Sequence, residues 1–183
     1  MRPSLVELSK FLSFVLRHNP VSIGVSLDSS GWAQVADLVN AAQKSGKPLT
    51  KKLLREIVEQ NDKQRFSFSE DGQRIRANQG HSIPIDLGLE PLSPPSILFH
   101  GTATRFLSSI QAKGLLPRGR RQVHLSSDER TARKVGQRHG KPVVLSIQAG
   151  QMSACGYRFY RSVNGVWLTE CVPIEFILFA EKS

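Results

Sequence analysis

The sequence predicts an α+β protein of two parts, the first rich in helices and the second rich in short strands. In the first half of the 183 residues, apolar side chains recur at helical spacing. The second half instead carries short apolar runs that are separated by turn residues. Between the halves, the segment 91–95 has three prolines in five residues, which excludes a helix or a central strand there. We therefore expect two domains, over residues 1–90 and 91–183.

Three short helices are expected in the first part. Ser4 and Glu7 have the spacing of a capping box, and Asn19-Pro20 ends the apolar stripe that follows them. A second helix is expected over residues 34–44. Thr50 can cap a third helix, whose apolar side chains would face inward.

A β-hairpin is expected after these helices. Residues 65–68 and 73–76 have strand-like patterns and flank the turn Glu70-Asp71-Gly72. Lys63 and Arg65 would then share one face at the start of the first strand, because strand side chains alternate between faces. Three short helices followed by a hairpin resemble a winged helix-turn-helix.

The second part is predicted to contain short strands and two helices. Strands are expected at residues 97–99, 123–126, 143–147, 166–169 and 176–179. Helices are expected over residues 103–113, where Gly114 ends the helix, and over residues 128–138. Few helices and many short strands predict an α+β domain built on a curved, mostly antiparallel sheet.

Basic residues dominate the charge, and they gather in the second part. The chain has 25 Lys and Arg against 15 Asp and Glu, which gives a formal net charge of +10. Residues 105–161 alone hold 12 basic and 2 acidic residues. Such a surplus favours a polyanionic partner such as nucleic acid or nucleotide phosphates.

Other features of the composition exclude several classes of protein. There are two cysteines, Cys155 and Cys171, too few for a disulfide scaffold or a cysteine-based zinc site; we expect both to be buried. No apolar run approaches the ~18 residues of a transmembrane helix. Residues 1–10 lack the apolar core of a signal peptide. The expected location is therefore the cytoplasm, with no membrane partner.

The pair Arg17-His18 closes the first predicted helix and has two interpretations. Cations in the last turn of a helix complement the helix dipole, which requires no function. Alternatively, the arginine binds a phosphate while the neighbouring imidazole transfers protons. This fragment alone leaves both interpretations open.

Two further histidines lie on predicted strands of the second part. His100 is followed by Gly101, which permits a ligand to approach the backbone closely, and by Thr102. His124 lies about one strand and one helix further along the chain. A lone histidine at a strand end is usually structural. Two histidines on neighbouring strands could ligate a metal, but no third ligand has suitable spacing, so no metal is expected.

Arginines cluster in the segment 114–121, just before a predicted strand. The segment is not a phosphate-binding P-loop, because Arg120 replaces the lysine and the segment follows a helix instead of a strand. Arg118, Arg120 and Arg121 remain as a cluster that is either a solvated loop or a phosphate contact.

Six motifs occur in an order that points to one family. They are Leu-Ser-Lys-Phe-Leu-Ser-Phe-Val-Leu-Arg-His at 8–18, Asn-Asp-Lys-Gln-Arg-Phe at 61–66, Gln-Gly-His-Ser at 79–82, Leu-Phe-His-Gly-Thr at 98–102, Val-His-Leu-Ser at 123–126 and Asn-Gly-Val-Trp-Leu at 164–168. With these motifs, the chain resembles the RNA 2′-phosphotransferases of the KptA type over nearly its whole length.

The resemblance implies a fold and a reaction. The fold would be an N-terminal winged-helix lobe joined to a C-terminal lobe of the ADP-ribosyltransferase type. An internal 2′-phosphate of RNA would attack C1″ of the nicotinamide ribose of NAD and release nicotinamide. The RNA-2′-phospho-ADP-ribose intermediate would then give 2′-OH RNA and ADP-ribose 1″,2″-cyclic phosphate. RNA and NAD are the implied partners, and neither a metal nor a protein partner is implied.

The resemblance also implies roles for individual residues. Arg17, His18, Arg65 and Arg120 match the catalytic Arg-His-Arg-Arg set of the family. Arg120 is selected because it stands four residues before His124, and a loop difference of one residue would select Arg121 instead. The residues that match the NAD-binding set are His100, Gly101, Thr102, His124, Ser126 and Val166.

Two other functions remain as alternatives. A non-catalytic winged-helix regulator of nucleic acid would concentrate basic residues on its recognition helix. Lys51, Lys52 and Arg55 are instead offset by Glu56 and Glu59, which disfavours this alternative. An ADP-ribosyltransferase that modifies another acceptor, such as a nucleic-acid end, would keep the same fold and stays open.

Overall fold

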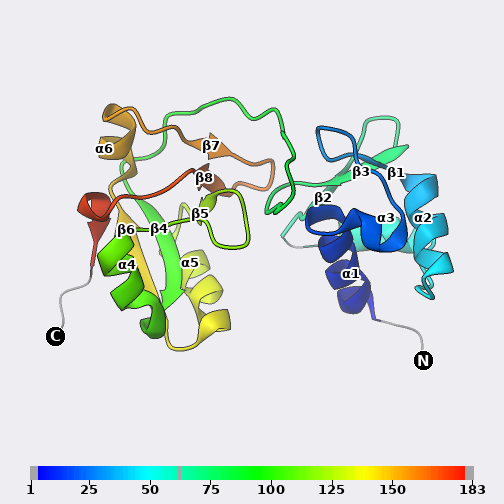
Figure 1. Ribbon diagram of the computed structural model, residues 1–183, viewed down its shortest axis with the longest axis horizontal. Helices are drawn as coiled ribbons and strands as arrows, with labels where there is room; N and C mark the ends of the chain where they lie inside the picture. Colours follow the sequence, from blue (N-terminus) through cyan, green and yellow to red (C-terminus); the bar gives the residue numbers. More distant parts are fainter. Residues whose placement is uncertain (1–3, 62, 180–183) are drawn as a thin grey trace. The chain divides into compact units, whose positions relative to one another are not determined.

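The computed structural model describes residues 4–61 and 63–179, so Asp62 of the second motif lies outside the described residues. The chain divides into two compact units, Met1–Gly88 and Leu89–Ser183. Each unit combines helices with small antiparallel sheets (Figure 1), which confirms the predicted α+β class.

The first unit contains the three predicted helices and the predicted hairpin. The elements are α1 (Leu5–Arg17), η1 (Pro20–Ile23), β1 (Ala33–Gln34), α2 (Val35–Lys44), α3 (Lys51–Glu59), β2 (Phe66–Phe68) and β3 (Arg74–Ala77). The capping box of α1 is present, because the side chains of Ser4 and Glu7 each accept a hydrogen bond from the other residue's backbone N–H. Thr50 caps α3 by accepting from the N–H of Leu53.

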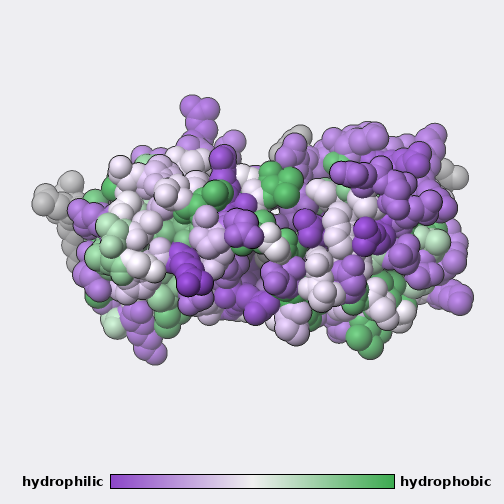
Figure 2. Space-filling view, turned by 90° about the horizontal axis from the view of Figure 1, so that it is seen from above, coloured by the Kyte–Doolittle hydropathy of each residue, from purple (hydrophilic) through white to green (hydrophobic). Residues whose placement is uncertain are grey.

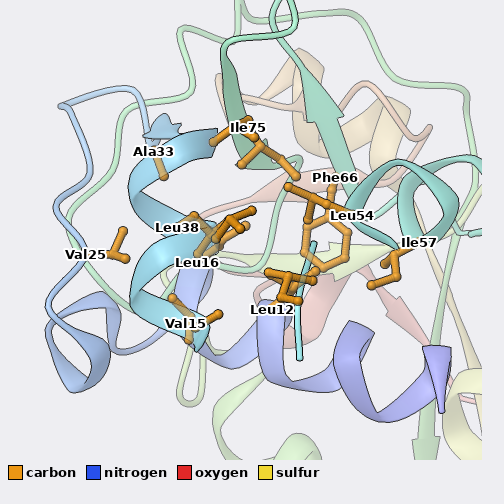
Figure 3. Close-up of a cluster of buried hydrophobic side chains, with 14 of the residues drawn as sticks. Leu12, Val15, Leu16, Val25, Ala33, Leu38, Leu54, Ile57, Phe66 and Ile75 are labelled. Atoms are coloured by element: carbon orange, nitrogen blue, oxygen red, sulfur yellow. The ribbon is translucent and has the colours of Figure 1, made fainter. Parts of the chain in front are cut away.

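The core of the first unit lies between its helices and a three-stranded sheet of order β1-β3-β2. Figure 3 shows side chains from all three helices and from β2 and β3 pointing toward one another. The apolar stripe of α1 supplies Leu12 and Leu16, which are fully buried against Leu38, Leu54 and Ile75. This packing fixes the C-terminal end of α1 relative to the loops that follow the sheet.

The expected pairing of Lys63 with Arg65 on one strand face is wrong. Strand β2 begins only at Phe66, and Gln64 has φ +41°, in the left-handed region. A residue in that conformation interrupts the two-residue alternation of a strand. The backbone therefore turns before Arg65 and does not enter the strand in extended form.

The second unit contains all five predicted strands, though several boundaries shift. The elements are β4 (Leu98–Ala103), η2 (Thr104–Phe106), α4 (Leu107–Lys113), β5 (Val123–Leu125), α5 (Glu129–Gly136), η3 (Gln137–His139), β6 (Pro142–Ile147), α6 (Ala149–Ala154), β7 (Tyr160–Arg161), β8 (Trp167–Thr169), η4 (Ile174–Phe176) and β9 (Ile177–Leu178). Helix α6 and strand β7 were not predicted, since six and two residues are too short for a periodic signal.

The strands of the second unit form two small sheets where the sequence predicts one. Their strand orders are β4-β6-β9 and β5-β8-β7, and every recorded strand pair is antiparallel. A single β-bridge, between Phe99 and Ser126, joins the two sheets. The ladder between β4 and β5 does not continue past this bridge, which divides the predicted sheet.

The expectation for the cysteines is also wrong. Cys155 is exposed and Cys171 is half-buried, and both are free. Cys155 lies at the C-terminal cap of the short α6, where the chain turns outward. In the described residues, no helix combines the length and apolar character needed to cross a membrane. The face shown in Figure 2 is predominantly hydrophilic, with hydrophobic residues in small groups.

Helix α5 packs unusually closely on β4, and two glycines permit it. A β-carbon at Gly101 would collide with the backbone carbonyl of Ala132 in α5. A β-carbon at Gly136 would lie 2.5 Å from the carbonyl oxygen of Thr102 in β4. The two backbones therefore touch directly, and neither position has room for a side chain.

We expect Gly101→Ala to destabilise the protein by about 3 kcal/mol, at the upper end of the usual cost of overpacking, because backbone must move to admit the methyl group. Urea denaturation monitored by circular dichroism measures this change. Gly119→Ala is the matched control, because a β-carbon at Gly119 would meet nothing within 4 Å. Equal unfolding midpoints for the two variants would contradict the close packing.

Candidate active site

Arg17 is the last residue of α1, and it is buried although it is charged. Only 7% of its surface is exposed. Gly80, which has φ +88°, lies over its side chain, so that a β-carbon there would stand 3.6 Å from Nη1. The carbonyl of Arg17 accepts a hydrogen bond from the N–H of Ser82 at 2.9 Å. A cation that merely complemented the helix dipole would remain in solvent, so this burial favours the anion-site interpretation.

His18 follows directly, and it is exposed. Its Nδ1 lies 2.9 Å from the hydroxyl oxygen of Ser82. That hydroxyl also approaches the carbonyl oxygen of Arg17, at 3.5 Å. Since a carbonyl oxygen can only accept, the hydroxyl donates to it and accepts from Nδ1–H of His18. Ser82 thereby orients the imidazole ring of His18.

Arg65 lies on the segment that carries the left-handed Gln64. The buried Asn78 fixes both residues, since its N–H donates to the Arg65 carbonyl at 2.9 Å and its Nδ2 donates to the Gln64 carbonyl at 2.6 Å. The side chain of Arg65 donates from Nη1 to Oδ1 of Asn61 at 3.5 Å. These bonds hold Gln64 in its uncommon conformation and fix the backbone from which the Arg65 side chain extends.

The segment from Asn78 to Ser82 brings the first three predicted site residues into one neighbourhood. Asn78 hydrogen-bonds to the backbone of Arg65, and Ser82 hydrogen-bonds to the Arg17 carbonyl and to the ring of His18. Four residue steps span at most about 14 Å of extended chain. The sequence places Ser82 in the motif at 79–82 without a role of its own, and it does not select Asn78.

An open groove begins at His18 in the same unit. Its volume is about 530 Å³, and its lining includes the apolar residues Val21, Leu27, Ile83 and Pro84. This volume falls within the range of small-molecule sites, although the groove is open. A substrate group bound at His18 therefore has apolar surface next to it.

His100 in β4 is held by the neighbouring strand. Its Nδ1 lies 3.1 Å from the backbone carbonyl oxygen of His124. Burial lowers the pKa of His100 below its ordinary value, and the positive charge of His139 acts in the same direction, against the hydrogen bond to His124. The ring is therefore neutral at pH 7. Because the carbonyl can only accept, Nδ1 carries the proton and Nε2 presents a lone pair.

Gly101 lies where the two sheets of the second unit separate. Phe99 exchanges both backbone hydrogen bonds with Ser126, at 2.9 and 2.8 Å. By the alternation of a strand, the N–H and C=O of Gly101 point to the same side as those of Phe99. The register would place His124 opposite Gly101, but the His124 carbonyl accepts from the His100 ring instead. The peptide N–H and C=O of Gly101 thus point away from β6, to the edge of β4 where the pairing with β5 has ended.

The remaining residues of the predicted cofactor set lie on or next to strands β4, β5 and β8. His124 is fixed through Nδ1, which donates to the Gln122 carbonyl at 3.0 Å. Val166 precedes β8, and its N–H donates to the Ser162 hydroxyl at 3.2 Å. The register of β5 and β8 continues to place Val166 opposite Ser126. Thr102 is buried on β4, next to Gly101.

Arg120 lies in the loop before β5, in the second unit, whereas Arg17 belongs to the first unit. Partial desolvation lowers the pKa of its guanidinium, and the like charge of Arg138 adds to this effect. Arg120 is nonetheless exposed, and an arginine stays protonated at neutral pH. Its backbone N–H bonds to the carbonyl of Arg118.

Among the described residues, no three His, Cys, Asp or Glu side chains are grouped so that they could hold a metal ion. His100 and His124 both use Nδ1 for a backbone carbonyl, as ligand or substrate-binding histidines often do. The arrangement provides oriented cations and imidazoles, which can bind and stabilise phosphate groups.

Comparison with known proteins identifies the family. The family model described as "RNA 2'-phosphotransferase, Tpt1 / KptA family" matches residues 3–171. The chain belongs to this family. Its relatives include a "Probable RNA 2'-phosphotransferase" of Acaryochloris marina, 56% identical over 181 residues, which covers 99% of this chain and 100% of the relative. One of the same name from Agrobacterium fabrum is 60% identical over 175 residues, covering 96% and 94%. As a member of the RNA 2′-phosphotransferase family, the protein is a transferase.

We expect Ser82→Ala to release the His18 ring while leaving the fold intact. The variant removes the acceptor of the Nδ1 proton, so turnover should fall roughly tenfold while unfolding free energy changes by about 1 kcal/mol or less. Nitrogen NMR of the imidazole should show Nδ1 losing its hydrogen bond. Ser45→Ala, which removes a 2.9 Å hydroxyl bond to the Ala41 carbonyl in the same unit, is the control. A fall of the same size in both variants would contradict the positioning role.

Proposed function

We propose that this protein removes an internal 2′-phosphate from RNA in a reaction that consumes NAD. The products would be 2′-OH RNA, nicotinamide and ADP-ribose 1″,2″-cyclic phosphate. The observation that carries the proposal is membership of the RNA 2′-phosphotransferase family over residues 3–171. The buried Arg17 beside His18 in the first unit, and the histidines held by backbone carbonyls in the second, support it.

The proposal includes the architecture of the two parts. We assign residues 1–90 to a winged-helix lobe, which the three helices and the sheet of order β1-β3-β2 support. We assign residues 91–183 to a lobe of the ADP-ribosyltransferase type. Its support is the pair of small antiparallel sheets that separate next to Gly101.

We assign the nicotinamide end of NAD to the space beside the edge of β4 at Gly101, where the two sheets separate. The peptide N–H and C=O of Gly101 face it, and a carboxamide group can both accept from and donate to such a pair. Neutral His100 offers Nε2 as an acceptor for a hydroxyl of the ribose. We assign Thr102, His124, Ser126 and Val166 to the wall of the same nucleotide site. These residues bind and orient, and none of them needs to act as a nucleophile.

In the first step, an oxygen of the RNA 2′-phosphate attacks C1″ of the ribose. The bond from C1″ to the nicotinamide nitrogen breaks, and its electron pair leaves with neutral nicotinamide. We assign Arg17, Arg65 and Arg120 to the phosphate, because guanidinium groups match phosphate oxygens and keep their charge throughout. Fixed cations can stabilise the charge that develops in both steps.

In the second step, the O2″ hydroxyl of the ribose loses its proton to solvent as its oxygen attacks phosphorus and closes the cyclic phosphate. The bond between phosphorus and the RNA 2′-oxygen breaks, and that oxygen must take up a proton. We assign this proton transfer to Nε2 of His18, whose Nδ1 is held by Ser82. An imidazole suits this task because its ordinary pKa of ~6.5 lies near neutral pH.

Two alternatives make different predictions. A regulator would bind RNA without turnover, but the chain belongs to a transferase family. An ADP-ribosyltransferase for another acceptor would leave ADP-ribose attached to a nucleic-acid end or a protein. The buried Arg17 beside His18 favours a phosphate acceptor over a hydroxyl or an amine.

The deciding experiment uses RNA with one internal 2′-phosphate, with and without NAD and in the presence of EDTA. We expect 2′-OH RNA only when NAD is present, together with one nicotinamide per phosphate removed. Phosphate release without NAD, or its appearance as free inorganic phosphate, would contradict the proposal. RNA that lacks the 2′-phosphate is the matched control and should consume no NAD.

His18→Ala should slow the second step more than the first. The first step expels nicotinamide and needs no proton at the RNA, whereas the second needs one for the departing 2′-oxygen. Loss of a proton donor typically costs ~10²–10⁴-fold. Labelled RNA mixed with NAD should therefore give a slower gel band, which is the ADP-ribosylated intermediate. A mutant that stops without this band would show that His18 serves from the start, in binding or structure.

A further inference from the structure

In the second unit, the ring of Phe106 contacts the guanidinium groups of Arg105 and Arg118. The guanidinium carbon of Arg105 lies 4.8 Å from the ring centroid, and that of Arg118 lies 4.6 Å from it. Phe106 is half-buried and packs against the hydrophobic core of the unit, and the ring of His139 meets it at 6.4 Å in a T-shaped arrangement. The ring therefore fixes two exposed cations to a rigid support.

These cations are not neutralised within the protein. In the part of the chain that the structure describes, the ion pairs are Arg74 with Asp28 and Arg133 with Glu129, and neither includes Arg105 or Arg118. Between residues 105 and 161 only Asp128 and Glu129 are acidic, and both lie at the start of α5. Arg138 adds a further positive charge close enough to act on Arg120. Such a concentration of charge favours an anionic ligand.

Stacking on an aromatic ring leaves the hydrogen-bonding edge of a guanidinium available. The guanidinium group of each arginine lies against the ring of Phe106, and its N–H donors can still reach a ligand. Less side-chain freedom is then lost when a ligand binds, because the stack already orders the side chain. Both arginines can therefore present N–H donors to phosphate oxygens. The shared ring of Phe106 sets the distance between the two guanidinium groups.

We propose that Arg105 and Arg118 form a clamp for the phosphodiester backbone of the substrate RNA, separate from the residues assigned to its 2′-phosphate. This proposal rests on the proposed function. Arg118 stands two residues before Arg120, and the two are joined by a backbone hydrogen bond. An RNA strand with its 2′-phosphate at Arg120 would bring a neighbouring backbone phosphate to Arg118. Arg105, on the same ring, would take the next one.

The test measures binding apart from chemistry. Fluorescence anisotropy with a single-stranded RNA that lacks the 2′-phosphate, without NAD, gives the affinity at several salt concentrations. We expect the double variant Arg105→Gln/Arg118→Gln to bind about tenfold more weakly at low salt. Its log–log salt slope should be smaller by about 1.4, since each phosphate contact on a single strand contributes ~0.7.

The matched control is Arg130→Gln/Arg133→Gln on α5, which removes the same charge from the same unit and should leave the slope unchanged. A second variant, Arg105→Lys/Arg118→Lys, keeps the charge but loses the planar stack, and we expect it to recover less than half of the lost slope. Equal slopes for the clamp and control variants would overturn the proposal. Full recovery by the lysine variant would overturn the stacked-fork geometry.

Turnover distinguishes this proposal from its rivals and from the proposed function. In the clamp variant, KM for a long 2′-phosphorylated RNA should rise while KM for NAD and turnover of a 2′-phosphorylated dinucleotide stay unchanged. A rise in KM for NAD instead would assign the clamp to the pyrophosphate of NAD and overturn the RNA assignment. If the wild-type protein shows the expected binding slope but no turnover, the clamp stands and the proposed function fails.

Discussion

The burial of one cation, Arg17, at the end of a helix organises the first unit. Burying a charge is unfavourable unless polar groups surround it, and the C-terminal end of α1 provides a partly negative setting. The chain places Gly80 over the guanidinium and ties Ser82 to the Arg17 carbonyl. Once that segment is in place, its two ends determine the positions of Arg65, through Asn78, and of His18, through Ser82. The packed apolar stripe of α1 keeps this arrangement rigid.

A different constraint operates in the second unit, where two backbones are in contact. Gly101 and Gly136 allow α5 to lie directly on β4, and this contact leaves no space for a side chain on either element. The opposite face of β4 carries His100, whose bond to the His124 carbonyl replaces the next step of the strand ladder. The same short strand thus joins the helix on one face and ends the sheet pairing along its edge. A glycine is required at this position for packing, whether or not a ligand also approaches it.

The sequence predicts the helices, the hairpin and most strands because these depend on local signals. Ser4 with Glu7 and Thr50 act within one helical turn, so their roles follow from spacing alone. Asn78 could not be found in this way, because its partners are set by the tertiary fold and lie 13 and 14 residues earlier in the chain. The left-handed Gln64 escapes prediction for the same reason, since nothing in its identity favours φ +41°. The motifs at 61–66 and 79–82 were marked by resemblance and not by local physics.

The contrast between His18 and His100 shows how environment separates two imidazoles in one chain. His100 is neutral because burial lowers its pKa, and its one ring proton is already donated to the His124 carbonyl. It has no proton to give at neutral pH, so its chemistry is limited to accepting a hydrogen bond through Nε2. His18 is exposed, and Ser82 holds its Nδ1. The second step of the proposed reaction needs a proton at the departing 2′-oxygen, so the exposed ring of His18 suits our assignment of that proton transfer, and the neutral ring of His100 suits our assignment to binding.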